Sequence, residues 1–284
     1  MRRVLAASLL AMSTATGSLL AQQQNAPQGG AGVPGGLLVQ DGRGGRGATA
    51  KPAAPAPRNE RGRVLLQGAN PGDKGVWLPG PGITGVPILD PAKVPFQPWA
   101  RSVLEDRLKH EFEPHTRCKP SGLARAFQTP YGVEFVELPE LQRIYIFDIG
   151  GPHTFKTIYM DGRSHPARFT PTAYGHSIGW WEGDTLVVDT TGFNERFWLD
   201  RKGLPHTELL RTVEKFTRVD RETMRYEITV DDRGAYTEPW TTSVIFRWEA
   251  NTELFEYVCQ QANYAIGLMV GGYEYVDRSS PIVP

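Results

Sequence analysis

The chain has 284 residues, and its 31 Lys and Arg balance its 31 Asp and Glu, so its charge gives no reason to expect a nucleic acid or an anionic membrane as partner. Gly and Pro are concentrated at the front: they make up 28 of the 79 residues 22–100, but only 25 of the 184 that follow. The irregular Gly spacing excludes collagen, and the sequence predicts a poorly ordered front and one globular domain.

The first 21 residues are typical of a secretory signal peptide. Arg2 and Arg3 precede an apolar stretch from Val4 to Met12, and small residues follow as far as Ala21. The apolar stretch is shorter than the ~20 residues that a membrane-spanning helix needs, and no further long apolar run follows it. We therefore expect cleavage after Ala21, no membrane span, and a secreted or periplasmic product.

Two segments without regular structure are predicted next, a disordered Gly/Pro-rich lead-in over 22–62 and an irregular Pro-rich segment over 63–98. The globular domain is expected over 99–284 and begins with the one predicted helix, over 99–112. The apolar residues of this helix fall on one stripe, and prolines bracket it at both ends. The stripe is formed by Val103, Leu104, Leu108 and Phe112. We expect the helix to pack on the domain as a lid.

From Val133 onward the apolar pattern changes to a period of two, which is typical of strands with one buried face. Short turn signals such as Glu182-Gly183 and Asp220-Arg221 force neighbouring strands to be antiparallel. Strands are predicted over 133–138, 142–148, 154–160, 175–181, 184–190, 193–199, 211–219, 222–230, 241–248 and 253–259. Closure into an antiparallel up-and-down β-barrel of eight to ten strands hides their edges best, so the predicted fold class is all-β. A two-sheet sandwich is the alternative.

The two cysteines, Cys118 and Cys259, fit a secreted protein. In an oxidising compartment a single pair usually closes a disulfide, here between the start of the domain and its last predicted strand. Two buried thiols are the alternative.

The sequence GHSIGWWEGDTLVVDTTGFN, residues 175–194, resembles a large family of mostly uncharacterised secreted bacterial proteins. Further matching stretches are YMDGRSHP from Tyr159, LPHTELLRTVEKFTRVD from Leu204, TVDDRGAYTEPW from Thr229 and ELFEYVC from Glu253. The resemblance covers roughly residues 98–260 and implies a lipocalin-like barrel. It implies no particular activity, so it marks the loops that would form a site without naming a reaction.

Three histidines in these stretches lie at the ends of predicted strands. Because imidazole titrates near neutral pH, they are candidates for proton transfer. We expect His176 to act as the base and His165 or His206 as the acid, with Asp161 and Tyr236 as orienting groups. For each histidine the alternative is a structural hydrogen bond to a loop carbonyl.

The same loops and strands supply candidates for ligand contact. These are Asn194, Trp180, Trp198, Tyr174 and Arg163. Tryptophans that line a cavity would favour an apolar or sugar-like ligand, but simple core packing is the alternative for each of them. Because neighbouring strand residues point to opposite faces, only one of Trp180 and Trp181 can face the barrel interior.

No cofactor is predicted. A divalent metal is an alternative, because His153, His165, His176 and His206 would satisfy zinc or iron if they met in space. The chain contains none of the compact ligand spacings HExxH, CxxC or HxH, however.

Three kinds of function are consistent with these features. The first is acid–base catalysis of the lyase, isomerase or hydrolase type on a small, partly apolar or carbohydrate-like molecule. The second is a carrier that binds a small ligand without changing it. The third is a structural module of the cell envelope, with the lead-in as a tether.

Overall fold

The computed structural model describes residues 53–70, 72–79, 91–129, 131–149, 154–257 and 259. The predicted signal peptide and most of the predicted lead-in lie outside these residues. The strands are β1 (Gly75–Pro79), β2 (Val133–Leu138), β3 (Arg143–Asp148), β4 (Phe155–Tyr159), β5 (His176–Glu182), β6 (Thr185–Thr191), β7 (Arg211–Arg218), β8 (Thr223–Asp231) and β9 (Trp240–Ala250). The helices are α1 (Pro98–His110) and α2 (Leu123–Ala126), with 3-10 turns η1 (Pro91–Lys93), η2 (Pro114–Arg117) and η3 (Pro139–Leu141).

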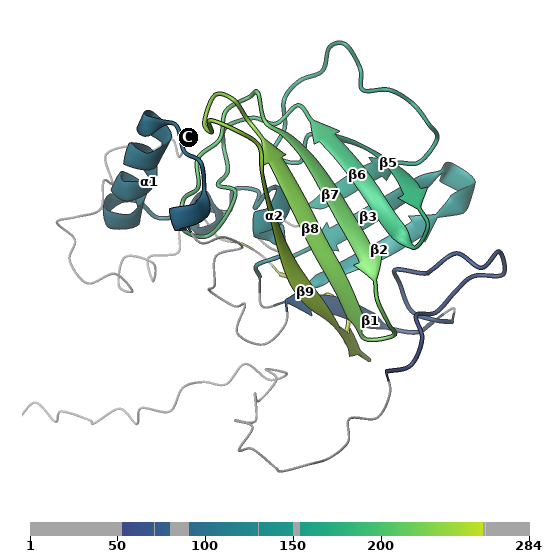
Figure 1. Ribbon diagram of the computed structural model, residues 1–284. Coiled ribbons are helices and arrows are strands. Elements are labelled where there is room, and N and C mark those ends of the chain that lie inside the picture. The colour runs from purple at the N-terminus through teal and green to yellow at the C-terminus, as the bar shows by residue number, and fades with distance from the viewer. Residues whose placement is uncertain are drawn as a thin grey trace, which may run out of the picture. The chain divides into compact units, whose positions relative to one another are not determined.

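The nine strands close into one barrel in the order of the sequence, with β1 paired to β9 (Figure 1). The all-β barrel prediction is confirmed, and the sandwich alternative is wrong because the ladder has no open edge. Every pairing is antiparallel except β4–β5, so the purely antiparallel prediction is wrong at that pair. The reason is the β4–β5 connection: residues 160–175 are long enough to bring the chain back to the end where β4 began.

Aromatic side chains fill the barrel interior. Strand β8 alternates buried and less buried residues, and its inward set is Met224, Tyr226, Ile228 and Val230. Phe127, which follows α2, makes ring contacts with Phe216, Tyr226 and Phe246, with centroid separations of 5.8, 4.9 and 5.5 Å. The residue after α2 therefore packs against three different strands of the barrel and forms part of its core.

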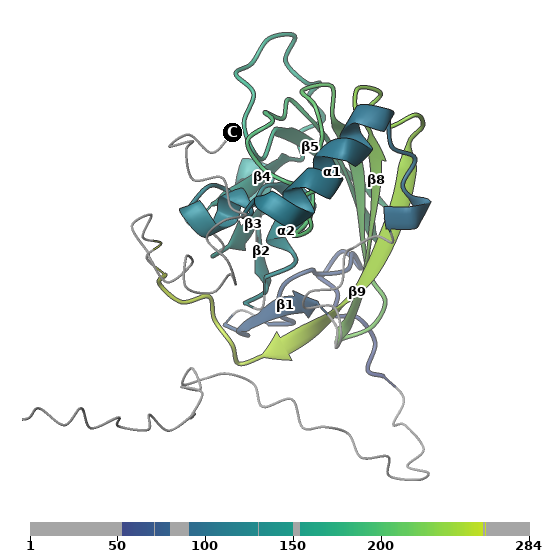
Figure 2. The same ribbon diagram turned by 90° about the vertical axis from the view of Figure 1, so that its left-hand side faces the viewer.

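Helix α1 lies across one end of the barrel, as Figures 1 and 2 show from two directions. Trp99 Nε1 donates to the Gly234 carbonyl at 2.8 Å, and Arg107 Nη1 donates to the Gly203 carbonyl at 3.1 Å. The predicted helix is confirmed, but its predicted stripe is only partly right. Leu104 is buried, whereas Leu108 is 57% exposed because it points away from the barrel.

Residues 53–70 close the opposite end of the barrel as a strap. The Arg218 guanidinium lies 4.9 and 5.4 Å from the ring centroids of Trp77 and Trp248, and it donates to the carbonyls of Leu65 and Gln67 at 2.7 and 2.6 Å. The strap includes residues 53–62, which the sequence predicts to be disordered. Strand β1 likewise lies inside the segment that was expected to be irregular, because Trp77 anchors it in the core.

Two predicted strands are absent from the described residues. Residues 193–199 form bends, held by a single bridge between Phe193 and Thr172, and 253–257 are irregular. Both segments have the apolar content of a strand, but the barrel is already closed without them. The predicted disulfide between Cys118 and Cys259 is confirmed. Among the described residues, no helix is long and apolar enough to cross a membrane.

Candidate functional site

Two of the predicted histidines meet on the outer wall of the barrel. His176 begins β5, and His165 lies in the β4–β5 connection. Their Nδ1 atoms are 2.9 Å apart, which is hydrogen-bond distance. Since Ser177 is buried and strand residues alternate, His176 points outward and remains partly exposed. The long connection that makes β4 and β5 parallel is also what returns His165 to His176.

A carboxylate lies behind the histidine pair. His165 Nε2 is 3.6 Å from Asp189 Oδ2, slightly beyond hydrogen-bond distance, and Arg211 forms a two-pronged ion pair with Asp189 at 2.9 and 2.7 Å. Burial of Asp189 raises its pKa, but the hydrogen bonds and charge of Arg211, with His165, outweigh this and hold the pKa below its usual value. Asp189 is therefore an ionised acceptor on the outer side of β6.

The order of these groups determines where the protons lie. An ionised Asp189 favours the hydrogen on Nε2 of His165, which leaves His165 Nδ1 as an acceptor. His176 then donates from its own Nδ1 across the 2.9 Å contact. A neutral His176 in this arrangement carries its free lone pair on Nε2, which is the atom available to take a proton.

Two aromatic rings lie near-parallel to His176. The Tyr159 and Phe169 ring centroids are 5.0 and 6.4 Å from that of His176. Burial by these rings lowers the pKa of His176, and the charges of His165 and Arg163 lower it further against the opposing effect of Asp161. A lowered pKa keeps His176 neutral at pH 7, which is the form a general base requires.

Asp161 and Arg163 lie beside this pair and bind each other. Arg163 Nε donates to both carboxylate oxygens of Asp161 at 2.8 and 2.9 Å, and its guanidinium lies 4.0 Å from the Tyr159 ring centroid. The hydrogen bonds from Arg163 lower the pKa of Asp161 to about 2. The two residues thus order the loop in front of His176, and their charges act on its pKa in opposite directions.

Comparison with known protein families, with curated proteins and with solved structures finds no match for this chain. The chemistry of the site is therefore inferred from its own geometry.

His206 lies apart from the histidine pair. Its Nε2 is 3.0 Å from the Phe197 carbonyl, its ring is 4.3 Å from the Phe197 ring, and none of its contacts within the described residues reaches His165 or His176. Burial lowers the pKa of His206 to about 4. Tyr236, predicted as an orienting group, is also buried, and its hydroxyl donates to the Pro205 carbonyl at 2.6 Å. His206 thus makes the loop-carbonyl contact that was the alternative for each histidine, and Tyr236 makes a contact of the same kind.

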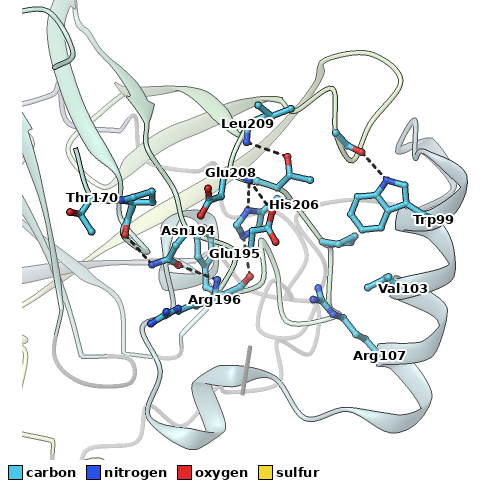
Figure 3. Close-up of a pocket in the computed structure, with 15 residues that line it drawn as sticks. Trp99, Val103, Arg107, Thr170, Asn194, Glu195, Arg196, His206, Glu208 and Leu209 are labelled. Carbon is cyan, nitrogen blue, oxygen red and sulfur yellow. Dashed lines mark hydrogen bonds between the residues drawn. The ribbon is translucent and has the colours of Figure 1, made fainter. Parts of the chain in front are cut away.

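A groove of about 950 Å³ lies between α1 and the loops at that end of the barrel. Figure 3 shows Asn194 and His206 at this groove, facing the α1 residues Trp99, Val103 and Arg107. The groove therefore contains two of the predicted site residues, but not the histidine pair.

The other predicted ligand contacts are dispersed. Tyr174 is partly buried, and its hydroxyl donates to Asp148 at 2.8 Å; burial, with the nearby carboxylate, raises its pKa. Trp198 packs under the Arg107 guanidinium, 5.0 Å from it. Trp180 is 41% exposed and bonds Glu182, while its neighbour Trp181 packs against the core, as the alternation predicted.

The described residues contain no group of three or more His, Cys, Asp and Glu side chains placed to hold a metal ion. Of the four histidines considered for a metal, only His165 and His176 meet, and His153 lies outside the described residues.

A buried charged cluster inside the barrel was not predicted. Lys156 on β4 forms an ion pair with Glu214 on β7, and the Tyr226 hydroxyl on β8 donates to the second Glu214 oxygen at 3.0 Å. All three side chains are at most 4% exposed. The sequence did contain a signal: Lys156 and Glu214 occupy the same alternating positions as Ile158 and Phe216, which are inward residues.

Proposed function

We propose that this protein catalyses acid–base chemistry on a small molecule, with His176 as the base. The observation that carries the proposal is the line of contacts from Asp189 through His165 to His176. A nucleophile or base that is oriented by a second group, itself held by a third, is the recurring arrangement of proton-transfer sites. His165 Nε2 and Asp189 Oδ2 are 3.6 Å apart, close enough for the ionised carboxylate to act on the imidazole charge.

Each residue has a distinct task in this proposal. His176 Nε2 takes a proton from the substrate, and the positive charge that develops on its ring is stabilised through His165 by the ionised Asp189. The same His176 Nε2 returns the proton to the product, so His176 is base and then acid, while His165 accepts the hydrogen bond from His176 Nδ1 and holds its ring in place. Arg211 is a positioning residue, since it fixes Asp189 by two hydrogen bonds.

We also propose that the protein works outside the cytoplasm and belongs with the lipocalin-like secreted family that its motifs resemble. The Cys118–Cys259 disulfide supports the location, because such bonds persist in oxidising compartments. The closed barrel supports the resemblance at the level of architecture only. A carrier of the kind that holds its ligand inside the barrel is less well supported, since Phe127 and the strand aromatics are packed there.

Hydrolysis of p-nitrophenyl acetate tests whether His176 Nε2 is an accessible, unprotonated nitrogen, as the proposed base requires, because a neutral imidazole attacks this ester, releases p-nitrophenolate and is regenerated by water. We expect His176→Ala to lower the protein-dependent rate at least tenfold, within the usual contribution of a general base. The rate should fall as the pH drops below 6.5, through the lowered pKa of His176. The matched control is His110→Ala: His110 is an exposed histidine bonded to Asp106 at 2.7 Å, without a second histidine. Equal loss in both variants, or no loss in either, would refute the proposal.

A further inference from the structure

The groove at the α1 end of the barrel is a second place where the chain can bind a small molecule. One stripe of α1 forms one wall, because Trp99, Val103 and Arg107 are spaced four residues apart. The loops that follow β6 form the other wall, with Asn194, Glu195 and Glu208. A volume of about 950 Å³ is within the range of small-molecule sites.

Arg107 is the unusual group in this groove. Its side chain is only 15% exposed, yet the nearest carboxylate oxygen, on Glu111, is 3.9 Å from its Nε, and Nε has no hydrogen-bond partner. Within the described residues its guanidinium donates to a neutral acceptor, the Gly203 carbonyl, and lies 5.0 Å from the Trp198 ring centroid. Burial lowers the pKa of Arg107, and Glu111, Tyr236 and Glu195 offset this only in part. The guanidinium is therefore a buried cation with incomplete compensation, and an anion in the groove would supply what is missing.

The wall beside Arg107 is apolar and preformed. Trp99 is 45% exposed, although its indole nitrogen is fixed by the Gly234 carbonyl. Leu209, on the opposite wall, is 54% exposed, which is unusual for a leucine of a packed domain. A flat apolar body between these two side chains would remove both from water without any rearrangement of Trp99.

From these contacts we propose that the groove binds a small organic anion with a flat apolar body, its carboxylate or sulfonate on Arg107 and its body against Trp99. Glu195 and Glu208 also line the groove, but both are exposed, so water and salt screen their charges. The buried Arg107 then dominates the choice of ligand charge. This inference does not rest on the histidine pair, which lies outside the groove.

Three naphthalene probes of equal shape separate charge from apolar contact. They are 2-naphthylacetate, its neutral amide, and 2-(2-naphthyl)ethylammonium, with binding measured by calorimetry at low salt. We expect the anion to bind about tenfold more tightly than the amide, as a hydrogen bond to a charged group predicts, and the cation to bind most weakly. Equal binding of all three by the native protein would overturn the proposal, whatever any variant does.

Variants assign the two contributions to residues. Arg107→Gln should remove the preference for the anion, whereas Trp99→Ala should weaken all three probes by a similar factor and keep that preference. Arg101→Gln is the matched control, since Arg101 lies on the same helix, is exposed and stacks on Phe96. Thermal unfolding checks that each variant is folded. His176→Ala should change binding less than twofold, so failure of the catalytic proposal would leave this one standing. An anion preference that survives Arg107→Gln in a folded protein would refute the role of Arg107.

Discussion

The barrel wall carries two charged clusters that use similar residues and have opposite relations to water. On the outside, Asp189 pairs with Arg211, whose side chain is 55% exposed. On the inside, Glu214 pairs with Lys156, and both are almost completely buried. Within the described residues, Arg211 gives the outer cluster a side chain that reaches solvent, whereas Lys156, Glu214 and Tyr226 are all enclosed. The comparison shows that accessibility, rather than the presence of charged side chains, separates a candidate reactive site from a structural one.

The inner cluster joins strands that are not neighbours. Strand β4 pairs with β3 at five positions but with β5 at only two, Ile158 and Tyr159. The β4–β5 ladder is therefore the weaker of the two. Lys156 gives β4 an attachment beyond its ladders with β3 and β5, since Glu214 lies on β7 and is bonded in turn by Tyr226 of β8. The ion pair therefore links β4 to β7 through the barrel interior.

The largest effect should come from breaking the inner pair. Glu214→Ala leaves Lys156 buried without a counter-charge, and removing one partner of a buried pair costs about 3 to 5 kcal/mol. In the outer cluster, Arg211→Ala should cost less, because the lost guanidinium is 55% exposed and solvated, although Asp189 itself is only 8% exposed. The free energy of unfolding in urea, measured for both variants, tests this contrast.

Replacing both partners provides the control. The double variant Lys156→Met with Glu214→Leu removes both charges and keeps a similar volume, so it should be far more stable than Glu214→Ala. If the double variant is as unstable as Glu214→Ala, loss of packing rather than an unpaired charge explains the effect.

A second contrast concerns the two kinds of histidine. His206 is buried with a pKa of about 4, below its usual 6.5. Above pH 6.5 it is neutral in both the folded and the unfolded chain. As the pH falls from 6.5 toward 4, only the unfolded chain takes up the proton, so stability is lost. At about 1.4 kcal/mol per pH unit, His206 should contribute a loss of roughly 2 kcal/mol by pH 5.

His206→Gln tests this expectation, because glutamine cannot titrate. The variant will lose its bond to the Phe197 carbonyl and be less stable at pH 7, but its stability should fall less between pH 7 and pH 5. His115 also has a pKa lowered by burial to about 4, so His115→Gln should flatten the curve in the same way. A His206→Gln curve parallel to that of the native protein would contradict the assignment.

The sequence predicted the barrel because period-two alternation survives in most strands, and it predicted α1 because two prolines bracket an apolar stripe. It did not predict the strap or β1. Their order comes from long-range contacts, such as Arg218 with the carbonyls of Leu65 and Gln67, that leave no local pattern. The parallel β4–β5 pair was missed because loop length permits either direction and only the closed barrel selects one.

The site was predictable in part for similar reasons. His165 and His176 lie only 11 positions apart and were both candidates, but nothing in the sequence separated them from His206, which packs against Phe197 instead. Asp189 was overlooked because it lies within an apolar strand, although the side chains before and after it, Val188 and Thr190, are the ones that face the barrel interior. The available signal was a charged residue in an apolar strand, at a position whose side chain points out of the barrel by alternation.

The smallest predicted effect concerns the support of the outer cluster. Gly192 has φ +78°, and a methyl group added there would overlap the ring of Phe169, which stacks on His176. Gly183 has φ +60° but nothing within 4 Å of the added methyl. Both Gly→Ala variants incur the roughly 1 to 2 kcal/mol of a left-handed alanine. Gly192→Ala should cost about 1 kcal/mol more, because Phe169 must move. It should also raise the pKa of His176, because a less buried imidazole is more easily protonated. A titration followed by NMR measures this pKa. Equal costs and an unchanged His176 titration would show that Phe169 does not hold His176 in place.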